Sequence, residues 1–135
     1  MKKPILLGMC PSDLSYEDLD PRAGSGKRIL EMVGASTFDA FERRNVLRSK
    51  LWRTIEARTK RTRLRDDLAG RTVVAFGNEV WLALALPRAP WFGSTVTKEG
   101  SKYWRVPHPS GRNLMYNKAK NRDMLRELLY RVANE

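Results

Sequence analysis

The sequence predicts an α/β fold of three layers, α/β/α, whose small and mostly parallel central sheet has about four strands. Short apolar runs that end at glycine or at a loop alternate with amphipathic segments along the chain. This alternation favours parallel strands with helices on both faces and right-handed crossovers. A chain of 135 residues, 41% of them hydrophobic, is also the size of one domain. We therefore expect residues 1–135 to form a single domain.

The first predicted strand covers residues 4–7, a continuous apolar run that starts at Pro4 and stops at Gly8. Such a run is typical of a parallel strand that is covered on both faces. Residues 9–25 follow, and they are rich in Pro, Ser, Asp and Gly without any periodicity. This composition predicts a long loop, and long loops in compact domains usually carry function.

The next three elements have weaker patterns. Residues 26–33 predict a short helix that stops at Gly34. Residues 41–47 predict a strand with Asn45 near its end, despite several charged side chains. Residues 52–68 predict a surface helix, because their apolar stripe is thin. The stripe consists of Leu51, Ile55 and Leu68.

The second half of the chain has clearer signals. Residues 71–76 form an apolar strand, and a helix over residues 78–86 follows it. The last strand covers residues 103–107, and the closing helix covers residues 118–132. The apolar face of this helix consists of Met124, Leu125, Leu128, Leu129 and Val132. We also expect Trp52 and Trp104 to belong to the core.

Four positions mark the carboxyl ends of the predicted strands: Gly8, Asn45, Gly77 and His108. Ligands of open α/β sheets bind in the crevice beyond these ends. We therefore expect the four positions to converge on one rim that holds the binding site. His108 stands between two prolines just before Ser110 and Gly111, on a stiff loop where functional residues concentrate.

The net charge points to a polyanionic partner. The chain has 26 Lys and Arg against 15 Asp and Glu, a formal charge of +11. A positive field of this size attracts nucleic acid and speeds its association. An anionic membrane surface would instead call for a helix with a large apolar face beside a basic one, and no segment has that pattern. We expect a monomer that binds single- or double-stranded DNA.

The basic residues concentrate between residues 42 and 65. Glu42 and Glu56 are the acids of this stretch. Its ten basic residues are Arg43, Arg44, Arg48, Lys50, Arg53, Arg58, Lys60, Arg61, Arg63 and Arg65. A stretch of one sign is expected to follow phosphates without regard to sequence. Among them we assign Arg58, Lys60 and Arg61 to DNA binding.

The counts of cysteine and histidine, and the N-terminal residues, bear on disulfides, metal sites and cellular location. One cysteine and one histidine exclude an internal disulfide and predict no structural metal and no cofactor. The apolar run at the N-terminus is too short for a signal peptide or a membrane span. We therefore expect a cytoplasmic protein that associates with the nucleoid through DNA.

Two further motifs allow alternative chemistry. Gly24-Ser25-Gly26-Lys27 is similar to a phosphate loop, which would make the chain a nucleotide hydrolase. Pro21 and Arg28 depart from that pattern, so we disfavour this hypothesis. Cys10 and His108 could form a thiolate and imidazole pair. We favour the alternative in which Cys10 is a small residue that lines a turn.

The two loops, taken together, resemble motifs of the uracil-DNA glycosylase superfamily. Gly8-Met9-Cys10-Pro11-Ser12 matches its G-x-x-P-x loop. His108-Pro109-Ser110-Gly111-Arg112-Asn113 is similar to its His-Pro-Ser loop, most closely in the single-strand-selective branch. The segment between them that begins Val73-Val74-Ala75-Phe76-Gly77 is similar to the strand, glycine and helix of the family. The resemblance spans nearly the whole chain.

This resemblance implies a monofunctional DNA glycosylase that acts on uracil or a related modified base. Such enzymes flip a base into a pocket and cleave its glycosidic bond, so the site must stabilise an anionic leaving base. His108 would bond the 2-carbonyl of the base, the Met9–Cys10 turn would assist through its N–H groups, and Asn45 would bind the imide edge. Ser110, Gly111, Arg112, Asn113, Leu114 and Met115 would contact DNA or wedge into its stack.

Three positions depart from the family pattern. Cys10 occupies the place of the residue that positions water. We therefore expect a carboxylate of the long loop, Asp13 first, or else Glu17, Asp18 or Asp20, to orient water. Tyr16 is the aromatic residue of the loop on which a base could stack, and Ser12 stands where the family shapes pocket selectivity. A second hypothesis follows: the chain binds flipped or single-stranded bases with little or no catalysis.

Overall fold

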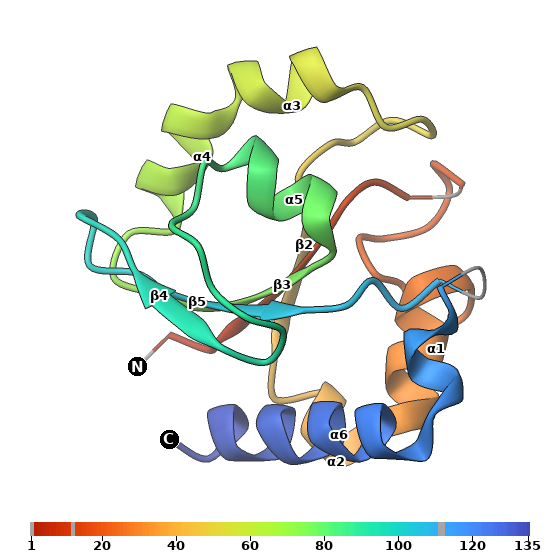
Figure 1. Cartoon of the computed structure of the whole chain (residues 1–135). Coiled ribbons are helices and arrows are strands. Elements are labelled where there is room, and N and C mark those ends of the chain that lie inside the picture. The colour runs from red at the N-terminus through yellow and green to blue at the C-terminus, as the bar shows by residue number, and fades with distance from the viewer. Residues whose placement is uncertain (1, 12, 111–112) are drawn as a thin grey trace.

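The computed structural model describes residues 2–11, 13–110 and 113–135, which form one α/β unit (Figure 1). Its strands are β1 (Ile5–Gly8), β2 (Glu42–Asn45), β3 (Thr72–Phe76), β4 (Ser94–Val96) and β5 (Lys102–Val106). Its helices are α1 (Gly24–Val33), α2 (Ala35–Phe38), α3 (Thr54–Thr59), α4 (Arg61–Asp67), α5 (Asn78–Ala83) and α6 (Ala119–Ala133). A 3₁₀ turn, η1 (Leu114–Asn117), precedes α6.

The sheet has five strands in the order β2-β1-β3-β5-β4. β1 pairs in parallel with β2 and β3, and β3 pairs in parallel with β5. β4 lies antiparallel to β5 at the edge. The predicted α/β class with a mostly parallel sheet is confirmed. The extra edge strand was not predicted, because Ser94–Val96 is short and half-exposed and has no apolar run.

Two apolar layers pack on opposite faces of the sheet. Alternate residues of the central strands point to opposite sides, as the two-residue period of a strand requires. Ile5 and Leu7 face α3, α4 and α5, whereas Leu6 faces α1, α2 and α6. Figure 1 shows the two groups of helices on either side of the sheet. This arrangement confirms the three layers expected from the sequence.

The predicted helix over residues 52–68 is wrong in its details. The segment forms two short helices, α3 and α4, which meet at Lys60. Leu51 and Ile55 are 68% and 80% exposed, so they do not belong to an inward stripe. Leu68, the third residue of the predicted stripe, is buried as predicted, and Ala57 and Leu64 face the core with it. The segment does lie on the surface, as predicted.

Edge position explains the weak pattern of β2. The predicted strand over residues 41–47 is four residues long in the structure, and it pairs with β1 on one side. Its other edge faces no strand of the described sheet, so charged side chains are tolerated there. Arg44 lies 3.9 Å from Glu42, and the guanidinium of Arg43 lies 4.7 Å from the ring centroid of Phe38.

The two tryptophans expected in the core are half-buried. Trp52 packs against the layer of α3 and α5, and Trp104 packs against the layer of α6. Lys102 and Arg131 lie over the ring of Trp104 at 4.8 and 5.5 Å from its centroid. Trp104 is therefore a covered surface residue rather than a central core residue.

The closing helix α6 allows a matched test of the core. Leu125 is fully buried in the α1, α2 and α6 layer, whereas the adjacent Met124 is 36% exposed. We expect Leu125→Ala to lower the free energy of unfolding by about 2–5 kcal/mol, because it leaves a cavity. Met124→Ala should cost less than about 1 kcal/mol, since little packing is lost. Urea unfolding of both variants measures these losses in the free energy of unfolding. Equal losses would contradict the assignment of Leu125 to the core and of Met124 to the surface.

Candidate functional site

The four positions predicted to form one rim do lie at the carboxyl edge of the sheet. Gly8 and Asn45 are paired residues of the neighbouring strands β1 and β2. Gly77 follows β3, and a side chain added to it would come within 3.1 Å of the Cβ of His108. Gly77 also has a φ of +93°, a conformation that favours glycine. The neighbouring strand ends thus bring His108 and Asn45 to the same edge.

A cavity of about 510 Å³ opens at this edge. Its wall includes Cys10 and Tyr16 from the loop after β1, and the turn that begins α1. Asn45 from the end of β2 completes one side, and Pro109 and Ser110 from the loop after β5 complete another. The cavity is therefore built by segments that follow three different strands, as expected for the ligand crevice of an open sheet.

Asn45 is the most distinctive residue of the cavity. It is only 7% exposed, and its backbone N–H and side-chain Nδ2 donate to the two oxygens of Asp18 at 3.0 and 3.4 Å. A carboxylate can only accept, so the amide nitrogen faces Asp18 and Oδ1 points away from it. Oδ1 is buried and accepts no hydrogen bond from a described residue. Such an oxygen calls for an N–H or O–H donor.

The glycine at position 8 makes room for this amide. A Cβ at Gly8 would lie 2.5 Å from Asn45 Oδ1 and 2.8 Å from Leu19 Cδ2. Any side chain at this position would therefore displace the amide or the loop. The glycine of the first motif is explained by this close approach.

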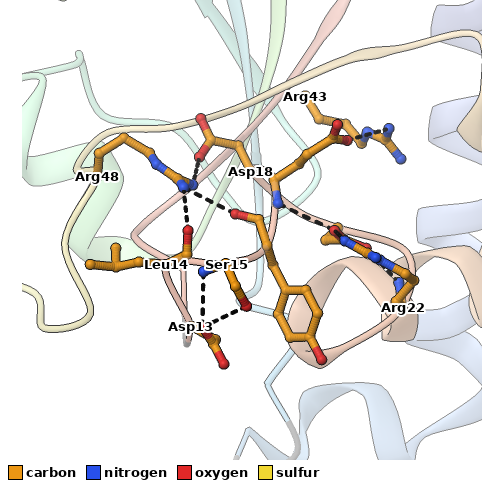
Figure 2. A network of polar contacts seen from close by, with 10 residues as sticks. Asp13, Leu14, Ser15, Asp18, Arg22, Arg43 and Arg48 are labelled. Atoms are coloured by element: carbon orange, nitrogen blue, oxygen red, sulfur yellow. Dashed lines mark hydrogen bonds and ion pairs between the residues drawn. The ribbon is translucent and has the colours of Figure 1, made fainter.

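Asp18 and Arg48 tie the long loop to the end of β2 (Figure 2). Arg48 Nη1 donates to Asp18 Oδ1 at 2.7 Å, and Nη2 donates to the carbonyl oxygens of Leu14 and Tyr16 at 3.1 and 3.0 Å. Arg48 was predicted to follow phosphates, but it serves this network instead. Sequence reasoning missed the pair, since its partners are separated by 30 residues.

A second carboxylate, Asp20, fixes the turn into α1. It is buried, and it accepts hydrogen bonds from the guanidinium of Arg22 and from the backbone N–H groups of Arg22 and Glu17. These hydrogen bonds, those from the guanidinium first, hold the pKa of Asp20 well below its ordinary value. Asp20 lines the cavity as a permanently charged and fully engaged carboxylate.

His108 is held by its own loop. The backbone N–H of Ser110 donates to Nδ1 at 3.1 Å, and burial lowers the pKa of His108 below its ordinary value. The neutral ring then carries its hydrogen on Nε2 and can donate there. The loop is braced by Tyr116, whose hydroxyl donates to the Pro107 carbonyl, and by Asn113, which donates to the His108 carbonyl. Pro109 and Ser110, the next two residues of this loop, line the cavity, whereas His108 itself is not among the lining residues.

Cys10 does not pair with His108. Its thiol is directed to the carbonyl oxygen of Lys50, with the sulfur at 3.8 Å. Burial raises the pKa of the Cys10 thiol, so the thiol stays protonated near neutral pH. The residue lines the cavity and joins the loop after β1 to the segment after β2. This geometry favours the small turn-lining residue over the thiolate nucleophile.

The other predicted base-binding and catalytic residues divide into two groups. Tyr16 lines the cavity, and the guanidinium of Arg22 lies 5.1 Å from its ring centroid. Met9 packs against the core on the α3 and α5 side and is not in the wall. Asp13 is exposed, outside the wall, and its Oδ1 accepts from the backbone and hydroxyl of Ser15. Ser12 lies outside the described residues.

The predicted DNA-contacting residues after His108 are only partly described. Gly111 and Arg112 lie outside the described residues. Leu114 is 69% exposed at the start of η1, and Asn113 caps this turn by accepting from the backbone N–H of Met115. The 3₁₀ turn was not predicted, because no periodic pattern marks so short an element. An exposed leucine next to the His108 loop is where a wedge residue was expected.

The basic surface of α3 and α4 contains fewer free cations than the sequence indicates. Arg58 and Lys60 are exposed and form no ion pair with a described residue. Arg61 Nε, in contrast, donates to the Ala83 carbonyl at 2.7 Å, and Arg65 Nη1 donates to that of Leu84. Arg61, predicted to bind DNA, therefore satisfies the carboxyl end of α5. The last carbonyl groups of a helix have no donor within the helix, so a guanidinium at the end of α5 can supply one.

The described residues contain no cluster of three or more His, Cys, Asp or Glu side chains that could hold a metal ion. Nor does any helix in the described ranges have the length and apolar character needed to cross a membrane.

No protein-family model matches this chain, and no curated protein is significantly similar to it.

The state of His108 can be measured directly, because it is the single histidine of the chain. We expect its titration midpoint to lie below the ordinary 6.5, since burial disfavours the charged ring. We also expect the Nε2–H tautomer at neutral pH. Nitrogen-15 NMR of histidine-labelled protein reports both properties. A midpoint above 6.5, or the Nδ1–H tautomer, would contradict the hydrogen bond from Ser110.

Proposed function

We propose that this chain is a DNA glycosylase that flips uracil or a related modified base into the cavity and hydrolyses its N-glycosidic bond. The observation that carries the proposal is the buried Oδ1 of Asn45, which lacks a donor among the described residues and belongs to a cavity that the loop after His108 also lines. The resemblance of the Gly8 and His108 loops to the uracil-DNA glycosylase superfamily supports the same activity. The net charge of +11 supports a nucleic-acid substrate.

In this proposal Asn45 recognises the base and His108 stabilises it as it leaves. The ring N–H of a uracil-like base would donate to Asn45 Oδ1, which is held in place by Asp18. Cleavage of the bond leaves negative charge on the base, and the Nε2–H of His108 would donate to the oxygen on which it develops. The neutral imidazole can donate from Nε2 because Nδ1 accepts the hydrogen bond from the Ser110 N–H.

Water must reach the sugar carbon, and three carboxylates line the cavity: Glu17, Asp20 and Glu31. Asp20 is fully engaged by Arg22 and by backbone N–H groups. The Glu17 carboxylate is exposed and lies 4.0 Å from Arg43 at its nearest approach. We assign the positioning of water to Glu17 in preference to Asp13, since Asp13 lies outside the wall.

A second candidate function is base recognition without cleavage. It is favoured by Cys10, which stands where the first loop would carry a water-positioning residue and whose thiol stays protonated. A protein of this kind would keep the cavity, Asn45 and the basic surface, and it would bind flipped or single-stranded bases. The excision experiment below separates the two functions.

The glycosylase proposal predicts that the purified protein releases a base from one of a set of single-stranded oligonucleotides. Each oligonucleotide carries uracil or one modified base, and the released base is detected by mass. We expect His108→Ala to slow release by about a hundredfold or more, as for loss of one donor to developing charge. His108→Gln should slow release less, because an amide N–H remains. Binding without release on every oligonucleotide would favour the recognition protein instead.

Two further variants act as controls for the water step. Glu17→Gln should slow base release without weakening oligonucleotide binding, because the amide cannot accept a proton from water. Asp13→Asn is the matched substitution on the same loop, and we expect it to leave the rate nearly unchanged. The reverse order would assign the water step to Asp13.

The basic residues of α3 and α4 are expected to fall into two groups, one that affects oligonucleotide binding and one that affects the stability of the fold. Arg58→Gln with Lys60→Gln should weaken oligonucleotide binding and reduce its salt dependence, with a slope change of about 1 for each lost phosphate contact. Arg61→Gln should lower the free energy of unfolding, because the Ala83 carbonyl loses its donor. Fluorescence anisotropy at several salt concentrations and urea unfolding measure these effects. Binding that is insensitive to Arg58 and Lys60 would place DNA elsewhere.

A further inference from the structure

The start of α1 opens on the same cavity as Asn45. Gly24, Ser25 and Gly26 are its first residues, and all three line the cavity. None of their backbone N–H groups donates to a described residue, whereas the N–H of Lys27 donates to the Ala23 carbonyl. The helix has no side-chain cap and no acid in its first turn. A helix start of this kind presents free donors and partial positive charge.

Two cations adjoin these donors. Lys27 is exposed and Arg28 is half-buried, and both line the cavity without an ion pair to a described residue. Of the cavity carboxylates, Asp20 is paired with Arg22 at 2.7 Å, whereas Glu17 is exposed and approaches Arg43 no closer than 4.0 Å. The third, Glu31, lies on a later turn of α1, away from its N-terminus. Lys27 and Arg28 are therefore the charged residues closest in sequence to these N–H groups, and Glu31 follows one turn later on the same helix.

The side-chain oxygen of Asn45 is a second, independent feature that points to a ligand in this cavity. Its side chain is buried, and Oδ1 has no donor among the described residues. The cavity thus presents N–H donors and cations at the start of α1 and an acceptor at Asn45. A ligand that matches both has an anionic group and, apart from it, a ring N–H. A nucleoside that carries a phosphate has these two groups.

We propose that the turn from Gly24 to Gly26, with Arg28, is a subsite for the phosphate of the nucleotide whose base lies at Asn45. This inference deepens the proposed function and rests on its assignment of the base to Asn45. The subsite binds the phosphate by charge-assisted hydrogen bonds from backbone N–H groups. No bond to phosphorus is made or broken there, so the role differs from that of a nucleotide hydrolase.

The subsite is tested by comparing uridine 5′-monophosphate with uridine in titration calorimetry. We expect the monophosphate to bind wild-type protein at least about tenfold more tightly. Ser25→Asp should abolish this advantage, because its carboxylate repels the phosphate and so weakens binding of the monophosphate far more than binding of the uncharged uridine. An acid in the first turn stabilises a helix, so the variant is expected to fold. Arg28→Gln should remove part of the difference in affinity between the monophosphate and uridine.

Ser36→Asp is the matched control, because it makes the same change at an exposed serine beyond the other end of α1. It should keep the full advantage of the monophosphate. Equal binding of uridine and its monophosphate to wild-type protein would overturn the proposal. So would an equal effect of Ser25→Asp and Ser36→Asp.

The source of the phosphate is resolved with a uracil-containing oligonucleotide whose two phosphates next to the uracil nucleotide are neutral methylphosphonates. Weaker binding of this oligonucleotide to wild-type protein, but not to Ser25→Asp, supports a phosphate within a strand. If Ser25→Asp weakens binding of uridine 5′-monophosphate but not of the oligonucleotide, the phosphate is that of a free nucleotide. The two proposals can fail separately. Tighter binding of the phosphorylated ligand without release of a base would overturn the glycosylase. Release of a base without any effect of Ser25→Asp on binding would overturn the subsite.

Discussion

The carboxylate of Asp18 is the interaction on which the site depends. It accepts from the backbone and side chain of Asn45 and from Arg48, so it joins the loop after β1 to the end of β2. The same contact orients the Asn45 amide and leaves Oδ1 without a partner among the described residues. Because Gly8 has no side chain, the amide can lie directly against the first strand. The Asn45 amide is therefore oriented by a carboxylate that is not part of the cavity wall.

Hydrogen bonds within the chain use a large part of its positive charge. Arg22 and Arg48 hold carboxylates of the long loop, and Arg61 and Arg65 satisfy carbonyls at the end of α5. Guanidinium groups suit this task because they present several donors in a fixed plane. The net charge of +11 is unchanged by this pairing, but the cationic side chains without a partner among the described residues are fewer than the 26 Lys and Arg of the sequence. Exposure and pairing, rather than the count of arginines, define the candidate surface.

The glycine-rich turn at the start of α1 differs from a phosphate loop in its surroundings. Gly24-Ser25-Gly26-Lys27 begins a helix, but it follows the long loop rather than a strand. Its free N–H groups face a cavity that other strand ends complete. A phosphate loop holds a triphosphate through one continuous segment, whereas this cavity combines the helix start with Asn45 from β2. The turn at Gly24 is therefore one of several segments that build the cavity wall, not a continuous cradle of its own.

Periodicity in the sequence was enough to predict the α/β class, the buried strands β1, β3 and β5, and the helix α6, because burial on one or both faces leaves a clear apolar pattern. It also placed Gly8, Asn45, Gly77 and His108 at one edge of the sheet, since parallel strands end on the same side. The short edge strand β4, the break at Lys60 and the bonds of Asp18, Cys10 and Arg61 were decided by the tertiary structure. Each of these features depends on partners that are distant in sequence, and no local pattern records them.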